Sequence, residues 1–221
     1  MLQLLIACDG SYENFKLSSE VKSCDSFDDL VFEYENKIIF IQAKHSLDDT
    51  EMIKASYFFT LSDNENFNLI KYFNAYEMIK RKYSKDEEDL KFIIYTNKDF
   101  DFHLNNQYGN CKLIYKKQIT KEKFNIFLKP IKFDGMELIS KYGNLYKIAS
   151  SCRSAEKQKN CTSEIEYLIL EQIYPKKTEF SDEDRKPIKT FLSELIFAVN
   201  QKNNEALDKI IEEKLSVRMH L

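Results

Sequence analysis

The chain has 221 residues, of which 43% are hydrophobic and 14% aromatic, so it can bury a sizeable core and is not an intrinsically disordered polymer. Its 33 Lys and Arg residues against 36 Asp and Glu residues give a formal charge of −3, which excludes a uniformly basic coat protein but leaves room for a local basic surface. The four glycines form neither G-x-G-x-x-G nor G-K-[ST], so glycine-rich phosphate loops are excluded.

Cysteine usage and the amino-terminal residues indicate the compartment. The five cysteines are odd in number and widely spaced, with no C-x-x-C pair and only three histidines to complete a zinc site. We therefore expect free thiols in a reducing, cytoplasmic compartment. Residues 1–10 carry no basic segment ahead of their short apolar run, so we expect neither a signal peptide nor a membrane helix, and no membrane partner.

The first half of the chain predicts alternating helices and strands. We expect the end of a helix over residues 2–7, then a strand over 15–21. A hairpin follows, with strands over 27–34 and 37–45. Apolar residues at helical spacing predict a helix over 64–83. The apolar run 90–97 is typical of a buried strand, and 111–119 is a further strand. This order predicts an α/β fold with a mixed β-sheet flanked by helices.

The pattern changes near residue 120. Ser163 and Glu166 have the spacing of a capping box, which predicts a helix that ends at Pro175. Asn203 or Asn204 can cap a last helix. We therefore expect two coupled units: an α/β core over residues 1–120, and a mainly helical region over 121–221 that packs on the core or extends it.

Three polar residues mark one end of the predicted hairpin. Asp29 opens its first strand, and Gln42 and Lys44 close its second. Because antiparallel strands bring the start of one beside the end of the other, we expect these side chains to meet on one face. Mg²⁺ binds such oxygen ligands together with water and a phosphate, and Lys44 would orient or deprotonate the attacking water. This chemistry is phosphodiester hydrolysis; the alternative is an ordinary ion pair between Asp29 and Lys44.

The segment D-L-V at residues 29–31, followed by I-F-I-Q-A-K at 39–44, resembles the PD-(D/E)XK nuclease superfamily in its Q-x-K variant. The pattern F-D-D-L-V-F with Q-A-K-H is also similar to nuclease-like domains of cytoplasmic-incompatibility-type toxins from intracellular bacteria and of large arthropod proteins. Y-T-N at 95–97 and F-A-V-N-Q at 197–201 are further likenesses to that group.

The resemblance implies roles for particular residues. Asp29 and Gln42 would bind Mg²⁺ or Mn²⁺, the backbone carbonyl of Ala43 would be a further ligand, and Lys44 would be the catalytic lysine. Many relatives add a glutamate from a helix ahead of the sheet, and Glu20 is the candidate for that place here. The implied activity is metal-dependent cleavage of DNA, with RNA left open as a substrate. The protein would be a toxin or effector domain that works in the cytoplasm. An effector would work in the cytoplasm of a host cell.

Two further interpretations follow from charge. The densest basic run includes Lys112, Lys116 and Lys117, which are candidates for contact with a nucleic-acid backbone, although a solvated surface explains them equally well. The slightly acidic net charge favours a competing function, a catalytically inactive pseudonuclease module that binds a cognate antitoxin or a partner domain.

Overall fold

The computed structural model describes residues 15–47, 50–60, 66–83, 89–102, 104–105, 111–117, 120–132, 143–149 and 161–201. Within this part of the chain, nine strands form one mixed sheet in the order β1-β2-β3-β4-β9-β8-β7-β6-β5. The strands are β1 (Phe15–Ser19), β2 (Leu30–Tyr34), β3 (Lys37–Lys44), β4 (Asp89–Thr96), β5 (Leu104–Asn105), β6 (Cys111–Lys116), β7 (Lys123–Pro130), β8 (Asn144–Ile148) and β9 (Leu195–Val199).

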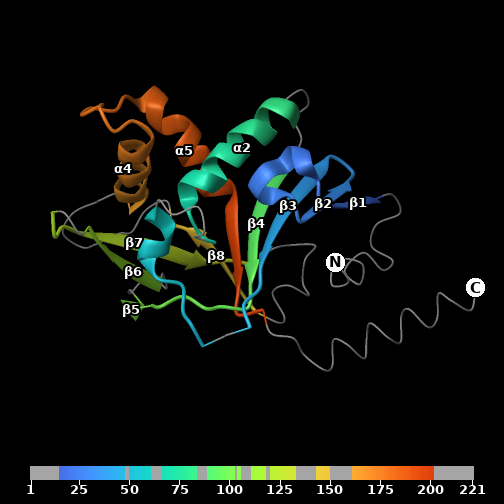
Figure 1. The fold of residues 1–221 in the computed structure, drawn as a ribbon, viewed down its shortest axis with the longest axis horizontal. Coiled ribbons are helices and arrows are strands. Elements are labelled where there is room, and N and C mark those ends of the chain that lie inside the picture. Colours follow the sequence, from blue (N-terminus) through green and yellow to red (C-terminus); the bar gives the residue numbers. More distant parts are fainter. Residues whose placement is uncertain are drawn as a thin grey trace, which may run out of the picture.

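Helices gather on one side of this sheet. The α-helices are α2 (Leu69–Tyr83), α4 (Cys161–Ile173) and α5 (Asp182–Glu194), and the short 3₁₀ segments are η1 (Lys22–Phe27) and η2 (Ala55–Phe59). Figure 1 shows α2, α4 and α5 together above the strands. The molecule is therefore an α/β protein with a mixed sheet, as the order of elements predicts.

The predicted hairpin is present, with one change at its start. β2 and β3 pair antiparallel from Leu30 opposite Ile41 to Tyr34 opposite Lys37, and the turn contains Glu35 at a positive φ of 50°. The first strand was expected from residue 27 but begins at Leu30, because the chain before it winds into η1 and carries the Phe27 ring into the core.

Parallel strands occupy the centre of the sheet. β3 pairs parallel to β4, and β4 pairs parallel to β9, whereas the outer strands pair antiparallel. A parallel pair needs a crossover connection, and the segment with α2 supplies it between β3 and β4. The predicted helix over 64–83 and strand over 90–97 correspond to α2 and β4.

The C-terminal part contains more strand than the sequence predicts. The predicted helix before Pro175 corresponds to α4, and α5 is a helix that the sequence analysis did not predict. β7, β8 and β9 join the same sheet, and α5 leads directly into β9. All five residues of β9 are buried, and such a short continuous apolar run does not distinguish a strand from a buried helix. The expected helices over residues 2–7 and after residue 203 lie outside the described residues.

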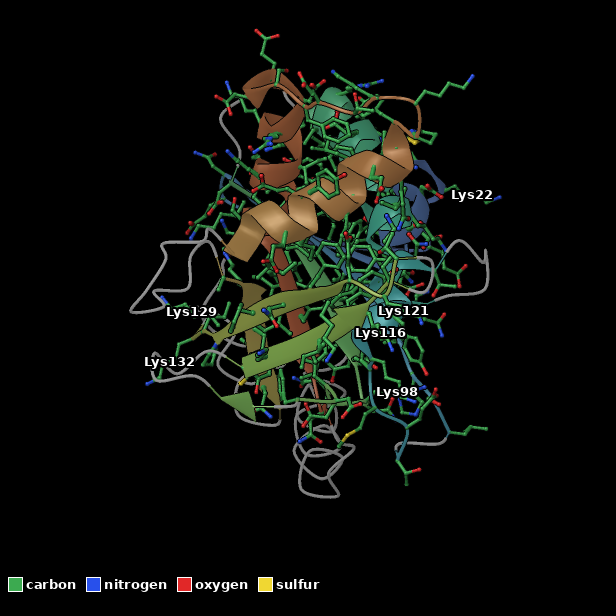
Figure 2. All side chains as sticks on the ribbon, turned by 90° about the vertical axis from the view of Figure 1, so that its left-hand side faces the viewer. Lys22, Lys98, Lys116, Lys121, Lys129 and Lys132 are labelled. Carbon is green, nitrogen blue, oxygen red and sulfur yellow. The ribbon has the colours of Figure 1, made fainter. Side chains whose placement is uncertain are left out.

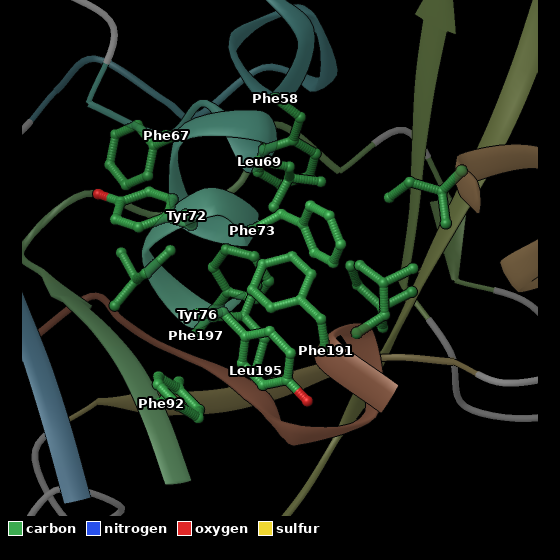
Figure 3. Packing of buried hydrophobic residues seen from close by; sticks show 14 of the residues in the cluster. Phe58, Phe67, Leu69, Tyr72, Phe73, Tyr76, Phe92, Phe191, Leu195 and Phe197 are labelled. Carbon is green, nitrogen blue, oxygen red and sulfur yellow. The ribbon is translucent and has the colours of Figure 1, made fainter. Parts of the chain in front are cut away.

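The main core lies between the helices and the sheet (Figure 3). Phe92 of β4 is central: its ring centroid is 5.0 Å from that of Tyr76, 5.1 Å from Phe27 and 5.2 Å from Phe40. Phe191 of α5 in turn contacts Tyr76 at 5.2 Å. Aromatic rings each bury a large apolar area, so this cluster ties α2, α5 and the central strands together.

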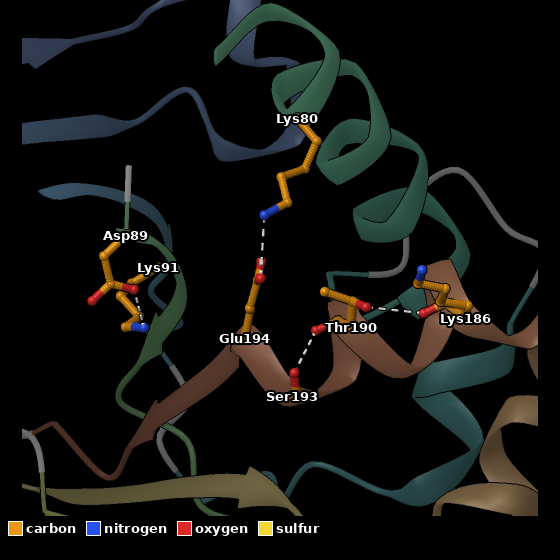
Figure 4. A network of polar contacts seen from close by, with 7 residues as sticks. All are labelled: Lys80, Asp89, Lys91, Lys186, Thr190, Ser193 and Glu194. Atoms are coloured by element: carbon orange, nitrogen blue, oxygen red, sulfur yellow. Dashed lines mark hydrogen bonds and ion pairs between the residues drawn. The ribbon is translucent and has the colours of Figure 1, made fainter. Parts of the chain in front are cut away.

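A polar contact also joins two helices at the edge of this core. Lys80 of α2 and Glu194 at the end of α5 form an ion pair with an N–O distance of 3.2 Å (Figure 4). On α5, the Thr190 hydroxyl donates to the Lys186 carbonyl, and the Ser193 hydroxyl donates to the Thr190 carbonyl. None of the described helices is both long and apolar enough to cross a bilayer.

Candidate functional site

The carboxyl ends of the parallel strands meet at one edge of the sheet. Lys44 ends β3 beside Thr96 of β4, and β9 ends at Val199 on the other side of β4. β2 runs antiparallel to β3, so Asp29, which directly precedes β2, reaches this same edge. Open α/β sheets commonly place their ligands at this kind of edge.

Asp29 is tied to the end of β3 by two hydrogen bonds. Its Oδ2 accepts from the backbone N–H of Ala43 at 2.7 Å and from the side-chain Nε2 of Gln42. The pairing of Leu30 with Ile41 dictates this contact, since the next pair along the ladder is Asp29 and Gln42. The expectation that these residues meet is therefore matched by the observed register.

Gln42 and Lys44 lie on the helix-covered face of the sheet. Ile38 and Phe40, four and two positions before Gln42, belong to the main core, and alternate residues of a strand share a face. Val31 of β2 is also in that core, which places Asp29, two residues earlier, on the same face. Gln42 is 4% exposed, so its amide must find its partners within the protein.

Lys44 is half-buried beside charges of both signs. Burial lowers the pKa of Lys44, the nearby carboxylates of Asp29 and Asp28 raise it, and Lys71 adds to the lowering. The net direction is downward, so this lysine gives up its proton more readily than an ordinary surface lysine. A lysine of this kind can act as a base or as a hydrogen-bond donor toward a developing negative charge.

The first turn of α2 contributes residues that the sequence pattern did not single out as site residues. The Asn68 side chain caps this helix by accepting from the N–H groups of Ile70 (2.8 Å) and Lys71 (3.0 Å). Tyr72 follows; burial raises its pKa, and the Asp29 carboxylate adds to the rise. Helical periodicity predicts a helix over these residues, but it cannot show that its first turn faces Asp29 and Lys44.

The loops after β4 and β9 complete the edge. Asn97 forms a reciprocal pair with Ser46: its Oδ1 accepts from the Ser46 N–H at 3.0 Å, and its Nδ2 donates to the Ser46 carbonyl at 2.7 Å. The Gln201 N–H donates to the Thr96 carbonyl at 3.1 Å. The two short patterns around residues 95–97 and 197–201 thus lie at the same edge as Lys44.

Gly143, just before β8, lies close to the end of β9 because it has no side chain. A Cβ on Gly143 would lie 2.5 Å from the carbonyl oxygen of Val199 and would collide with the Gln201 side chain. Gln201 is 3% exposed, and its Nε2 donates to that same Val199 carbonyl at 3.3 Å. Gly143 therefore lets β8 approach the end of β9 closely.

Glu20, the candidate further ligand, lies beside Asp29 along the backbone. Its N–H points to the Asp29 carbonyl at 3.4 Å, and it has a positive φ of 51°. Its side chain is exposed. The hydrogen bonds of the Asp29 side chain, among the described residues, go to Gln42 and Ala43 and not to Glu20.

The three candidate lysines for nucleic-acid contact do not form one group. Lys117 pairs with Glu171 of α4, its Nζ lying 2.7 and 2.6 Å from the two carboxylate oxygens. Lys112 and Lys116 lie on one face of β6. Cys111 and Leu113 lie on its other face and point into the main core. Figure 2 shows Lys116 with Lys121 at one end of β6 and β7, and Lys129 with Lys132 at the other.

The oxygen atoms at this edge define which cation it could hold. A carboxylate, a side-chain amide and a backbone carbonyl are hard ligands of the kind that Mg²⁺ and Mn²⁺ take, with water filling the other positions. Among the residues that the structure describes, no three or more His, Cys, Asp and Glu side chains gather in the way that a zinc site needs. The donor set therefore fits a hydrated hard cation and not zinc.

Comparisons of the chain with protein-family models, with curated proteins and with solved structures found no match.

Proposed function

We propose that this protein is a divalent-metal-dependent nuclease of the PD-(D/E)XK type, in its Q-x-K variant, that hydrolyses phosphodiester bonds in DNA. One observation carries the proposal: the Asp29 carboxylate, the Gln42 amide and the half-buried Lys44 lie together on one face at the carboxyl edge of the sheet. Three scattered sequence positions thereby supply two oxygen ligands and a cationic group within one site.

Asp29, Gln42 and the carbonyl of Ala43 would hold Mg²⁺ or Mn²⁺. The Ala43 N–H points to Asp29, and the N–H and C=O of one strand residue face the same neighbouring strand, so this carbonyl is on the Asp29 side. When bound, the cation supplies charge that polarises the phosphate and acidifies water. Gln42 would turn its amide oxygen toward that charge, in place of the N–H that it now donates to Asp29.

Lys44 has the second role. Its lowered pKa leaves it able to take a proton from the attacking water, or to hold that water while its ammonium balances charge on the phosphate oxygens. Lys71, which is electrostatically coupled to Lys44, places a second positive charge at the same side of the site. A phosphodiester carries the negative charge that these groups complement.

The test compares two lysines at opposite ends of the same strand. Lys44→Ala should lower Mn²⁺- or Mg²⁺-dependent cleavage of plasmid DNA and labelled oligonucleotides by about 10²- to 10⁴-fold, the usual worth of a general acid–base group. Lys37→Ala is the control, because Lys37 is exposed at the start of β3, at the far end from Lys44, and its Nζ lies over the Tyr34 ring, 5.5 Å from the ring centroid. Equal cleavage by the two folded variants would rule out the assigned site.

A pseudonuclease that docks a protein partner is the second candidate, and the lack of a three-residue His, Cys, Asp and Glu cluster among the described residues favours it. Calorimetric titration with Mn²⁺ separates the two functions. The nuclease requires binding that Asp29→Asn weakens by tenfold or more, about 1.4 kcal/mol, together with cleavage. A folded chain that binds no divalent cation and cuts neither DNA nor RNA would leave the docking module as the function.

A further inference from the structure

Three adjacent strands of the sheet carry an unbalanced charge. β6, β7 and β8 contain no aspartate or glutamate. The rest of the chain is rich in acidic residues, with 36 in total against 33 basic ones. We call the lysines of these strands the lysine face: Lys112, Lys116, Lys123, Lys129 and Lys147.

All five lysines occupy the same face of the sheet. Their neighbours along the strands, Leu113, Ile126, Leu128 and Ile148, belong to the main core on the helix-covered face. Because successive residues of a strand point to opposite faces, the lysines point to the other one. This is also the face opposite the one that carries Gln42 and Lys44.

The register places like charges directly against each other. Lys116 lies opposite Lys123, and Lys129 lies opposite Lys147. Burial lowers the pKa of Lys147, and the neighbouring Lys91 adds to the lowering. Like charges directly opposite each other destabilise a sheet, and an acidic residue in place of one lysine of each pair would remove this repulsion. The arrangement has a clear use when a polyanion binds and neutralises it.

The two carboxylates that act on Lys147 of the lysine face form ion pairs with other lysines. Asp89 and Glu194 both act on Lys147 electrostatically. Asp89 forms an ion pair with Lys91, and Glu194 forms one with Lys80 (Figure 4). Within the described part of the chain, neither carboxylate forms an ion pair with Lys147.

An aromatic ring lies among these charges. Phe127 of β7 is half-buried and directly opposite Lys112 of β6, and Lys129 is the next residue of its strand on the same face. The two lysines of β7 lie six positions apart, a length of about 20 Å at the usual rise of a strand. Lysines that track a backbone, beside an aromatic ring that can stack with a base, are what sheet surfaces use to bind single strands.

We propose that the lysine face binds single-stranded nucleic acid, with the lysines on the phosphates and Phe127 stacked on a base. In a duplex the bases are stacked on each other and cannot stack on Phe127, and a membrane surface has no bases. A single strand can contact both the lysines and the Phe127 ring. This binding goes beyond the proposed nuclease and does not depend on it, because it lies on the opposite face of the sheet and needs no metal ion.

Fluorescence anisotropy of the full chain with a labelled oligothymidylate of about 20 nucleotides, in EDTA, tests the proposal. The double variant Lys116→Glu, Lys129→Glu should weaken binding at least tenfold and flatten the dependence of log K on log salt by about 0.7 for each phosphate that is no longer neutralised. The control Lys186→Glu, Lys189→Glu makes the same charge change on exposed positions of α5 and should leave the affinity within about twofold of wild type.

Stability provides a second readout. Each glutamate of the double variant faces a lysine across the ladder, so this variant should unfold at the same or a higher temperature than the wild type while it binds less. Phe127→Leu keeps an apolar side chain and should lose about fivefold or more in affinity.

Several results would overturn the proposal. These are equal weakening by the two double variants, no binding by the wild type, or equal affinity for duplex and single-stranded probes. Binding to vesicles that contain phosphatidylserine but not to the oligonucleotide would assign the face to a membrane surface instead. Loss of cleavage in Lys44→Ala with unchanged oligonucleotide binding would support both proposals separately.

Discussion

At the scale of single residues, Lys44 shows a conflict between stability and chemistry. It is half-buried, and burial lowers its pKa by more than the carboxylate of Asp29 raises it. The folded protein therefore releases this proton at a lower pH than the unfolded chain does. Its charge disfavours folding at neutral pH, and this penalty fades as the pH rises through the folded pKa toward the unfolded one. Sites that carry out chemistry often accept such costs.

We therefore expect Lys44→Met to raise the urea midpoint of unfolding at pH 7, because it fills the same space without a charge. The gap between variant and wild type should narrow at pH 9.5, because the folded protein releases the Lys44 proton at a lower pH than the unfolded chain does. Urea titrations of both proteins at the two pH values measure this difference. A variant less stable than wild type at pH 7, or a gap that does not change with pH, would contradict the account.

At the scale of elements, α5 illustrates a helix whose start is encoded locally. The Ser181 hydroxyl accepts from the Asp184 N–H at 3.3 Å, and the Asp184 carboxylate accepts from the Ser181 N–H at 2.8 Å, which is a complete capping box. Lys177 and Ser181 lower the pKa of Asp184 to about 2. The folded pKa is below the unfolded one, so this contribution is complete above the unfolded pKa and is lost as the pH falls through the folded one.

Ser181→Ala should lower the free energy of unfolding by about 1 kcal/mol, since it removes the N-cap acceptor of α5. Ser193→Ala is the matched control in the last turn of the same helix, where the exposed hydroxyl donates to the Thr190 carbonyl and caps no backbone N–H of the first turn. Its effect should stay within about 0.5 kcal/mol. Urea unfolding at pH 7 measures both variants, and similar losses in the two would show that the cap does not stabilise α5.

At the scale of the whole molecule, both halves of the chain build one sheet. β9 pairs parallel with β4 from Phe92 opposite Leu195 to Tyr95 opposite Ala198, and it pairs antiparallel with β8 on its other side. Strands β1 to β4 and strands β5 to β8 are therefore joined through the last described strand. Phe191 and Phe197 add their rings to the core that contains Phe92.

A fragment of residues 1–120 should therefore fail to fold. Without β9, β4 would expose an apolar edge, and such edges pair with other chains. We expect the fragment to aggregate or to lack near-UV circular dichroism, whereas the full chain should unfold in one transition by fluorescence and far-UV signals. A monomeric fragment that unfolds cooperatively would show instead that the first 120 residues are a domain of their own.

The sequence by itself determined the hairpin, α2, β4 and the meeting of Asp29, Gln42 and Lys44. These features depend on local periodicity and on one tight turn, which sets the register of every later pair in the ladder. The same alternation put Lys112 and Lys116 on one face of β6. Short-range rules suffice here because the residues concerned lie on one strand or on two neighbouring strands.

Only the tertiary structure decided the rest. The position of β9 between β4 and β8, the closeness of the first turn of α2 to Lys44, and the pairing of Lys117 with Glu171 all join segments far apart in the chain. The gathering of five lysines on one face likewise depends on which strands are neighbours. Local patterns carry no information on such contacts, because burial and charge pairing between distant segments select them only when the whole core assembles.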